Sequence, residues 1–89
     1  MKTIRLYLFG RVQGVGMRFT VMQIAKKVGV KGYVKNLSDG SVEIVAQGKS
    51  AQVDDFIKRA KNARTGNITD TSLEVLDTRK TFNGFNVEF

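Results

Sequence analysis

The spacing of apolar residues changes from every second residue to every third or fourth, twice, within 89 residues. From Thr3 to Phe9 successive residues alternate between two faces, with the aliphatic Ile4, Leu6 and Leu8 on one of them. This alternation predicts a half-buried strand. From Met17 to Val28 apolar residues recur at i, i+4, i+7 and i+8, which predicts an amphipathic helix. Helices and strands must bury their apolar sides against one another, so this pattern favours helices layered on a sheet.

Five further elements are expected after this helix. They are strands at Val30 to Asn36 and Ser41 to Gln47, a helix from Ser50 that ends near Asn62 to Gly66, and strands at Ser72 to Leu76 and Phe85 to Phe89. Asp39-Gly40 suits a hairpin turn between the first two of these strands. Ser50 is the expected N-cap of the second helix, and Gly29 the expected end of the first.

The element order predicts an α/β (α+β) fold, a ferredoxin-like split βαβ sandwich with an antiparallel sheet and two helices on one face. With 89 residues, the chain is expected to form a single domain, 1–89. A right-handed crossover is expected to bring the strand at Val30 to Asn36 beside the strand at Thr3 to Phe9.

Two missing residue types restrict the chemistry that the chain can perform. It has no cysteine and no histidine, so it has no disulfide, no thiolate nucleophile and no imidazole base or metal ligand. No apolar run approaches the roughly 18 residues that span a bilayer. Arg5 lies where a signal peptide needs apolar residues. A soluble, cytoplasmic protein is therefore expected.

The positive charge is concentrated in the first part of the chain. The net charge is +7, yet residues 1–36 hold eight basic residues and no acidic one, while residues 37–89 hold seven basic and all eight acidic residues. A segment of one sign attracts anions, which could be phosphorylated metabolites, nucleic acid or acidic membrane, or it could simply aid solubility. Charge alone leaves these alternatives open.

A loop with three glycines, Gly10 to Gly16, joins the first strand to the first helix. Such a loop can point N–H groups and the positive end of the helix dipole at an anion, although it can also be only a tight turn. Arg18 favours the anion, because a cation in the first turn of a helix is unfavourable by roughly 0.3–1 kcal/mol without one. A P-loop and a dinucleotide fingerprint are both excluded, since no Gly-Lys-Ser/Thr stands at the end of this loop and Phe19 stands where the fingerprint needs glycine.

Asn36 ends the strand before the hairpin turn. Asparagine there is most often a turn residue. Near a bound anion, however, its amide could orient a water molecule and donate to a developing charge, although it is too weak to act as a base.

These residues carry a resemblance to a known family. The segment Gly10-Arg11-Val12-Gln13-Gly14-Val15-Gly16-Met17-Arg18, followed by Gly32-Tyr33-Val34-Lys35-Asn36 and Gly40-Ser41-Val42, closely resembles acylphosphatase. The similarity extends over essentially the whole chain. Met17 stands where the family usually has an aromatic residue and Tyr33 where it often has tryptophan, changes expected to affect packing more than mechanism.

The resemblance implies hydrolysis of an acyl phosphate to a carboxylate and inorganic phosphate, with no metal and no cofactor. It implies that Arg18 and Asn36 are catalytic, Asn36 by orienting the attacking water. The phosphate would be held by Val12, Gln13, Gly14, Val15, Gly16, Met17 and Arg18. The implied partners are a small-molecule acyl phosphate and inorganic phosphate as product and inhibitor, with no nucleic acid or membrane. A monomer is the default expectation, because no long apolar stripe is left over for an interface.

Two alternatives remain from the sequence. A ferredoxin-like sheet with a basic surface is also the architecture of an RNA-binding module that stacks bases on aromatic residues of two neighbouring strands. Tyr7 and Phe9 could serve as the stacking aromatic residues of one strand, but the neighbouring strand at Ser41 to Gln47 has no aromatic residue. The other alternative is a domain that binds phosphate without turnover, against which the presence of both Arg18 and Asn36 counts.

Overall fold

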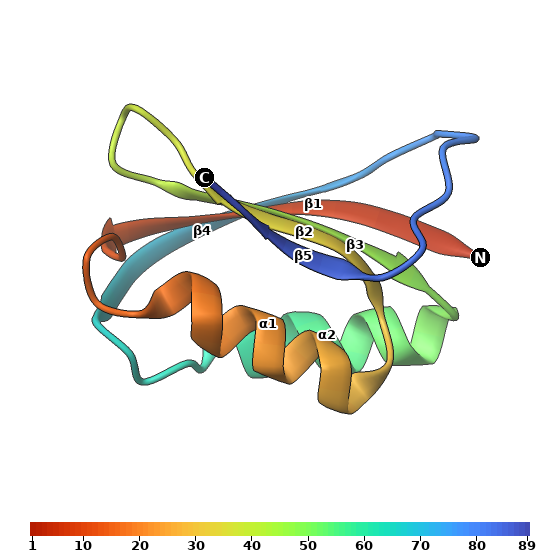
Figure 1. The fold of residues 1–89 in the computed structure, drawn as a ribbon, viewed down its shortest axis with the longest axis horizontal. Helices are drawn as coiled ribbons and strands as arrows, with labels where there is room; N and C mark the ends of the chain where they lie inside the picture. The colour runs from red at the N-terminus through yellow and green to blue at the C-terminus, as the bar shows by residue number, and fades with distance from the viewer.

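The alternating segments form a five-stranded sheet, and both helices pack on one of its faces (Figure 1). The structure, a computed structural model, describes all residues from Met1 to Phe89. In chain order the elements are β1 (Lys2–Arg11), α1 (Met17–Val28), β2 (Lys31–Asn36), β3 (Val42–Gly48), α2 (Ser50–Lys61), β4 (Asn67–Val75) and β5 (Phe85–Glu88). Neither helix has the length and hydrophobicity needed to span a bilayer.

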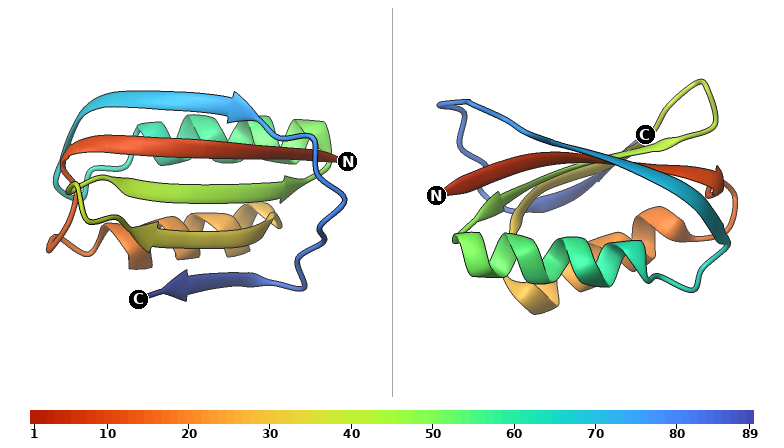
Figure 2. Two further views of the ribbon diagram at one scale, coloured as in Figure 1. Left: turned by 90° about the horizontal axis from the view of Figure 1, so that it is seen from above. Right: turned by 180° about the vertical axis from the view of Figure 1, so that it is seen from behind.

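The strand order β4-β1-β3-β2-β5 confirms the ferredoxin-like fold and corrects two expectations. First, β2 does not lie beside β1, because β3 folds back from the hairpin and fills the place between them. Second, the sheet is mixed, because β5 pairs with β2 in parallel. The long connection after β4 runs along the end of the sheet where β1 begins, so β5 starts at the same end as β2 (left view of Figure 2).

The sheet topology brings the carboxyl ends of three strands to the same end of the sheet. β1 and β2 are both antiparallel to β3, so they run in the same direction, and β5 runs parallel to β2. The carboxyl ends of β1, β2 and β5 therefore lie at the same end of the sheet, where α1 begins (left view of Figure 2). A residue that follows β1 can thus lie near residues that end β2 and β5, although β3 separates β1 from β2.

The core lies between the sheet and the helices, as the two apolar periods predict. Ile4, Leu6 and Leu8 alternate toward the helices and are fully buried. Both helices bury the predicted apolar stripes, with Met17, Val21 and Ala25 in α1, and Val53, Phe56, Ile57 and Ala60 in α2. Each such large side chain contributes roughly 1.5–3 kcal/mol on burial, so this core fixes how α1 sits on the sheet.

Most element boundaries lie within one or two residues of the sequence prediction, and two of the differences are informative. Lys49, not Ser50, is the N-cap of α2, and its N–H donates to Gln52 Oε1 at 3.3 Å. β4 begins at Asn67 rather than Ser72. β4 is an edge strand exposed along most of its length, so its first half needs few apolar residues and shows no alternation.

Candidate active site

The loop between β1 and α1 presents its backbone rather than its side chains. Gly14 and Gly16 adopt left-handed φ angles of 72° and 80°, which residues with a Cβ rarely adopt. On either side of these glycines, the side chains of Val12 and Met17 are 1% exposed and belong to the core. Met17 therefore packs its side chain into the core.

The N–H groups of residues 13–19 donate to no protein acceptor. The first helical hydrogen bond is the one from Thr20 N–H to the carbonyl of Gly16, at 3.1 Å. α1 has no side-chain cap and no acidic residue in its first turn. Unpaired N–H groups and the positive end of a helix dipole together attract an anion.

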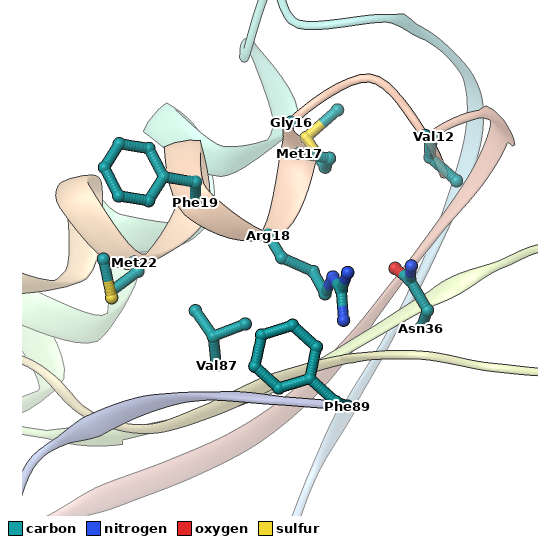
Figure 3. Close-up of a pocket in the computed structure, with 10 residues that line it drawn as sticks. Val12, Gly16, Met17, Arg18, Phe19, Met22, Asn36, Val87 and Phe89 are labelled. Atoms are coloured by element: carbon teal, nitrogen blue, oxygen red, sulfur yellow. The ribbon is translucent and has the colours of Figure 1, made fainter.

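Arg18 lies in this first turn, and the end of β5 holds its side chain. Arg18 Nη1 donates to the carbonyl of Glu88 at 3.1 Å, and the guanidinium carbon lies 4.6 Å from the centre of the Phe89 ring. A cation over an aromatic face is an attractive arrangement. These two contacts direct the guanidinium toward the space beside the loop (Figure 3).

Asn36 is the last residue of β2 and faces the helices, as Val34 does two residues earlier. Its Oδ1 atom is shielded from solvent and accepts no hydrogen bond from the protein. An unpaired buried acceptor costs about 1–3 kcal/mol, which a donor such as a water molecule would recover. Asn36 lies across the pocket from the start of α1, with Arg18 between them (Figure 3).

The Gln13 side chain does not line the pocket but joins the loop to the β2–β3 turn. Its Nε2 donates to the carbonyl of Leu37 at 2.7 Å and to that of Ser41 at 2.9 Å. Both carbonyls also accept hydrogen bonds inside the turn, from Gly40 N–H and from Leu37 N–H. Gln13 therefore ties the loop to the residue that follows Asn36, a contact that the sequence did not predict.

These elements enclose a pocket of about 400 Å³ at the edge where the three strands end (Figure 3). Of the residues expected at the site, Val12, Gly14, Gly16, Met17, Arg18 and Asn36 line it, while Gln13 and Val15 do not. The sequence did not point to four further lining residues, which are Phe19, Met22, Val87 and Phe89. Arg18 is the only charged residue of the lining.

No acidic side chain lines this pocket. Elsewhere in the fold, no three carboxylates gather in a group that could hold a metal ion.

The opposite face of the sheet presents a carboxylate at its centre. Glu43 accepts hydrogen bonds from the hydroxyls of Tyr33 at 2.9 Å and Tyr7 at 3.4 Å, and Arg5 Nε lies 3.7 Å from it. Burial and the bond to Glu43 raise the pKa of Tyr33 to about 12. A carboxylate between the aromatic residues would repel the phosphates of RNA, which argues against the RNA-binding alternative.

The fold and the pocket define a class of protein: a ferredoxin-like α+β sandwich with an acid-free, cationic pocket where the first helix begins.

Comparisons with known proteins identify the family. The family described as Acylphosphatase matches residues 4–87. An acylphosphatase of Ligilactobacillus salivarius is 41% identical over 90 residues, which cover 100% of both chains. The crystal structure of acylphosphatase from Bacillus subtilis superimposes with a TM-score of 0.94 at 34% identity, again over 100% of both chains. The chain belongs to the acylphosphatase family, whose members are hydrolases that act on acyl phosphates.

A larger protein also contains a similar structure. Full-length HypF, solved in a phosphate- and nucleotide-bound form, superimposes with a TM-score of 0.90 at 28% identity. The match covers 99% of this chain and 12% of HypF.

Proposed function

We propose that this chain hydrolyses acyl phosphates to a carboxylate and inorganic phosphate at the pocket beside Arg18. One observation carries the proposal: unpaired N–H groups, a guanidinium and an unpaired amide oxygen all border one acid-free pocket. Each of these groups has a use in the hydrolysis of an acyl phosphate, and membership of the acylphosphatase family supports the same reaction.

The phosphoryl group would be held by the loop that joins β1 to α1. We assign the cradle to the backbone of Val12, Gln13, Gly14, Val15, Gly16 and Met17 together with the side chain of Arg18. Arginine offers two parallel N–H donors to two phosphoryl oxygens, and this geometry fixes the group as well as neutralising it. The bond from Arg18 to the Glu88 carbonyl supports this role, since it holds the guanidinium beside the loop.

Asn36 would orient the attacking water, which donates a hydrogen bond to Oδ1. The water oxygen forms a bond to phosphorus as the bond between phosphorus and the acyl oxygen breaks, and that electron pair leaves with the carboxylate. The proton of the water passes to a phosphoryl oxygen, so no protein base is required. A carboxylate is a good leaving group, so positioning and charge neutralisation are sufficient for catalysis without histidine.

Several further statements belong to this proposal. Residues 1–89 act as one domain and as a monomer, in the cytoplasm, without metal or cofactor. The residues present supply donors for the phosphoryl group and an acceptor for the water, which supports a mechanism that uses protein groups alone. Inorganic phosphate, the product, would compete with the substrate for the same cradle.

Hydrolysis of benzoyl phosphate by the purified protein in EDTA tests the proposal, with Arg18→Ala as the site variant. Arg79→Ala is the matched control, because Arg79 does not line the pocket. Circular dichroism establishes that all three proteins are folded. We expect turnover in EDTA that Arg18→Ala abolishes and Arg79→Ala retains. A folded wild-type protein without turnover would contradict the proposal and favour a domain that only binds phosphate.

A further inference from the structure

The pocket beside Arg18 is larger than a phosphoryl group requires. Its volume is about 400 Å³, whereas a water molecule takes about 30 Å³ and a phosphoryl group only a few times that. The groups proposed to bind phosphate and water border only part of this space. Four apolar side chains, Phe19, Met22, Val87 and Phe89, line the rest.

Two of these apolar side chains are unusually exposed. Phe19 is 58% and Phe89 is 97% exposed, and they are two of the five large hydrophobic residues that the fold leaves exposed. Their position at the rim of one pocket is informative, because exposed apolar residues that gather around a concavity are typical of ligand sites. Met22 and Val87, the other two apolar lining residues, are partly buried and pack against the core.

The direction of the reaction connects this apolar part to the substrate. In an in-line displacement the attacking and leaving oxygens lie on opposite sides of phosphorus. In Figure 3, Asn36 lies on one side of the Arg18 guanidinium, and Phe19, Met22 and Val87 lie on the other. With water held at Asn36, the leaving carboxylate and its substituent point toward the apolar side chains.

We propose that Phe19, Met22 and Val87 form an acyl subsite that selects acyl phosphates with an apolar acyl group, aryl or branched alkyl. This inference rests on the proposed function. Arg18 is the only charged residue of the pocket, and it is occupied with the phosphoryl group. An acyl group with its own carboxylate or amine finds no partner in the subsite and loses its hydration there.

A comparison of kcat/KM for several acyl phosphates, in the wild type and in variants of the pocket, tests the subsite. The substrates are acetyl, isobutyryl, benzoyl and succinyl phosphate, and each kcat/KM is divided by the uncatalysed rate of that substrate. The variants are Phe19→Ala and Val87→Thr, which replaces one methyl group by a hydroxyl. Leu73→Ala and Val75→Thr are the matched controls, because both residues are exposed apolar side chains of β4 outside the pocket.

We expect the wild type to favour benzoyl over acetyl phosphate by at least about tenfold, and succinyl phosphate to be the poorest substrate. Each site variant should lower the benzoyl-to-acetyl ratio by about three- to tenfold, because benzoyl phosphate loses more contacts than acetyl phosphate. The control variants should keep the wild-type ratio. Inhibition by inorganic phosphate, which has no acyl group, should keep its constant within about twofold in all variants.

Two results would overturn the inference, and they differ. An active wild type whose benzoyl-to-acetyl ratio stays the same in both site variants would overturn the acyl subsite alone. A folded wild type that hydrolyses none of the four acyl phosphates would overturn the proposed function, and the subsite with it.

Discussion

Replacing Gln13 by methionine should slow turnover without removing the phosphate cradle. Methionine has a similar length but no donor, so both hydrogen bonds to the turn at Leu37 and Ser41 are lost. These bonds tie the loop to the residue that follows Asn36. Without them the amide of Asn36 loses its fixed position relative to the loop, while the N–H groups of the loop remain.

The structure sets the size of the two effects. A protein hydrogen bond contributes about 0.5–1.5 kcal/mol net, and the two carbonyls keep their bonds within the turn. The loss of stability should therefore be about 1–2 kcal/mol, at the lower end for two such bonds. A displacement of about 1 Å in a positioning group costs up to about 100-fold in rate, so kcat should fall by about 10- to 100-fold.

Urea unfolding gives the stability, and hydrolysis of benzoyl phosphate in EDTA gives kcat. Gln52→Met is the control for kcat, because the Gln52 amide also donates to a backbone carbonyl, that of Val28 at 3.4 Å, away from the pocket. It is not a control for stability, since it also loses the bond from Lys49 N–H at the start of α2. A double variant with Asn36→Ala shows whether Gln13 acts through Asn36. In that case Gln13→Met adds little to the loss caused by Asn36→Ala. A full additional loss of kcat in the double variant would refute the reasoning.

Four other outcomes are expected. Arg18→Lys should lose at least about tenfold in kcat/KM despite its charge, because an ammonium cannot bind two oxygens in one plane, and near-normal kinetics would exclude the bidentate role. Asn36→Ala should lower kcat by about 100-fold with little change in phosphate inhibition, whereas a loss confined to KM would contradict water positioning. Phosphate at 100 times its dissociation constant should stabilise the fold by about 2.7 kcal/mol, seen as a raised Tm, and no shift would contradict the cradle. Because the pKa of Tyr33 is raised from 10.0 to about 12, its contribution to stability is complete below pH 10 and is lost as pH rises toward 12. Ultraviolet titration should find Tyr33 ionising nearer pH 10 in Glu43→Gln, and an unchanged midpoint would remove Glu43 as a cause.

The sequence predicted what short-range patterns determine. The alternation from Thr3 to Phe9 and the helical stripe from Met17 gave the elements and the ferredoxin-like fold, because each element must bury its apolar side. The hairpin of β2 with β3 was confirmed, but the expected place of β2 beside β1 was wrong, because right-handedness of a crossover does not say whether another strand fills the space between the strands that it joins. That choice depends on how the hairpin folds back, which is a property of the whole sheet.

The site was predictable where its residues belong to short sequence motifs. The resemblance pointed to the loop, Arg18 and Asn36, and residues of the loop border one pocket together with Arg18 and Asn36. The side-chain bonds of Gln13 and the contact from Arg18 to Glu88 join residues 24 to 70 positions apart. No local pattern contains such contacts, because they arise only when the sheet brings the ends of β1, β2 and β5 together.

The contact between Arg18 and the Glu88 carbonyl makes turnover sensitive to local unfolding. β5 has four residues, pairs with β2 alone and forms an edge of the sheet, so its opening costs less free energy than unfolding of the whole domain. Each opening releases the guanidinium and withdraws Phe85 from the edge of the core, while the rest of the core and most of the circular dichroism signal stay unchanged. Activity should therefore disappear at a lower urea concentration than the sheet, so turnover reports the opening of β5 rather than global unfolding.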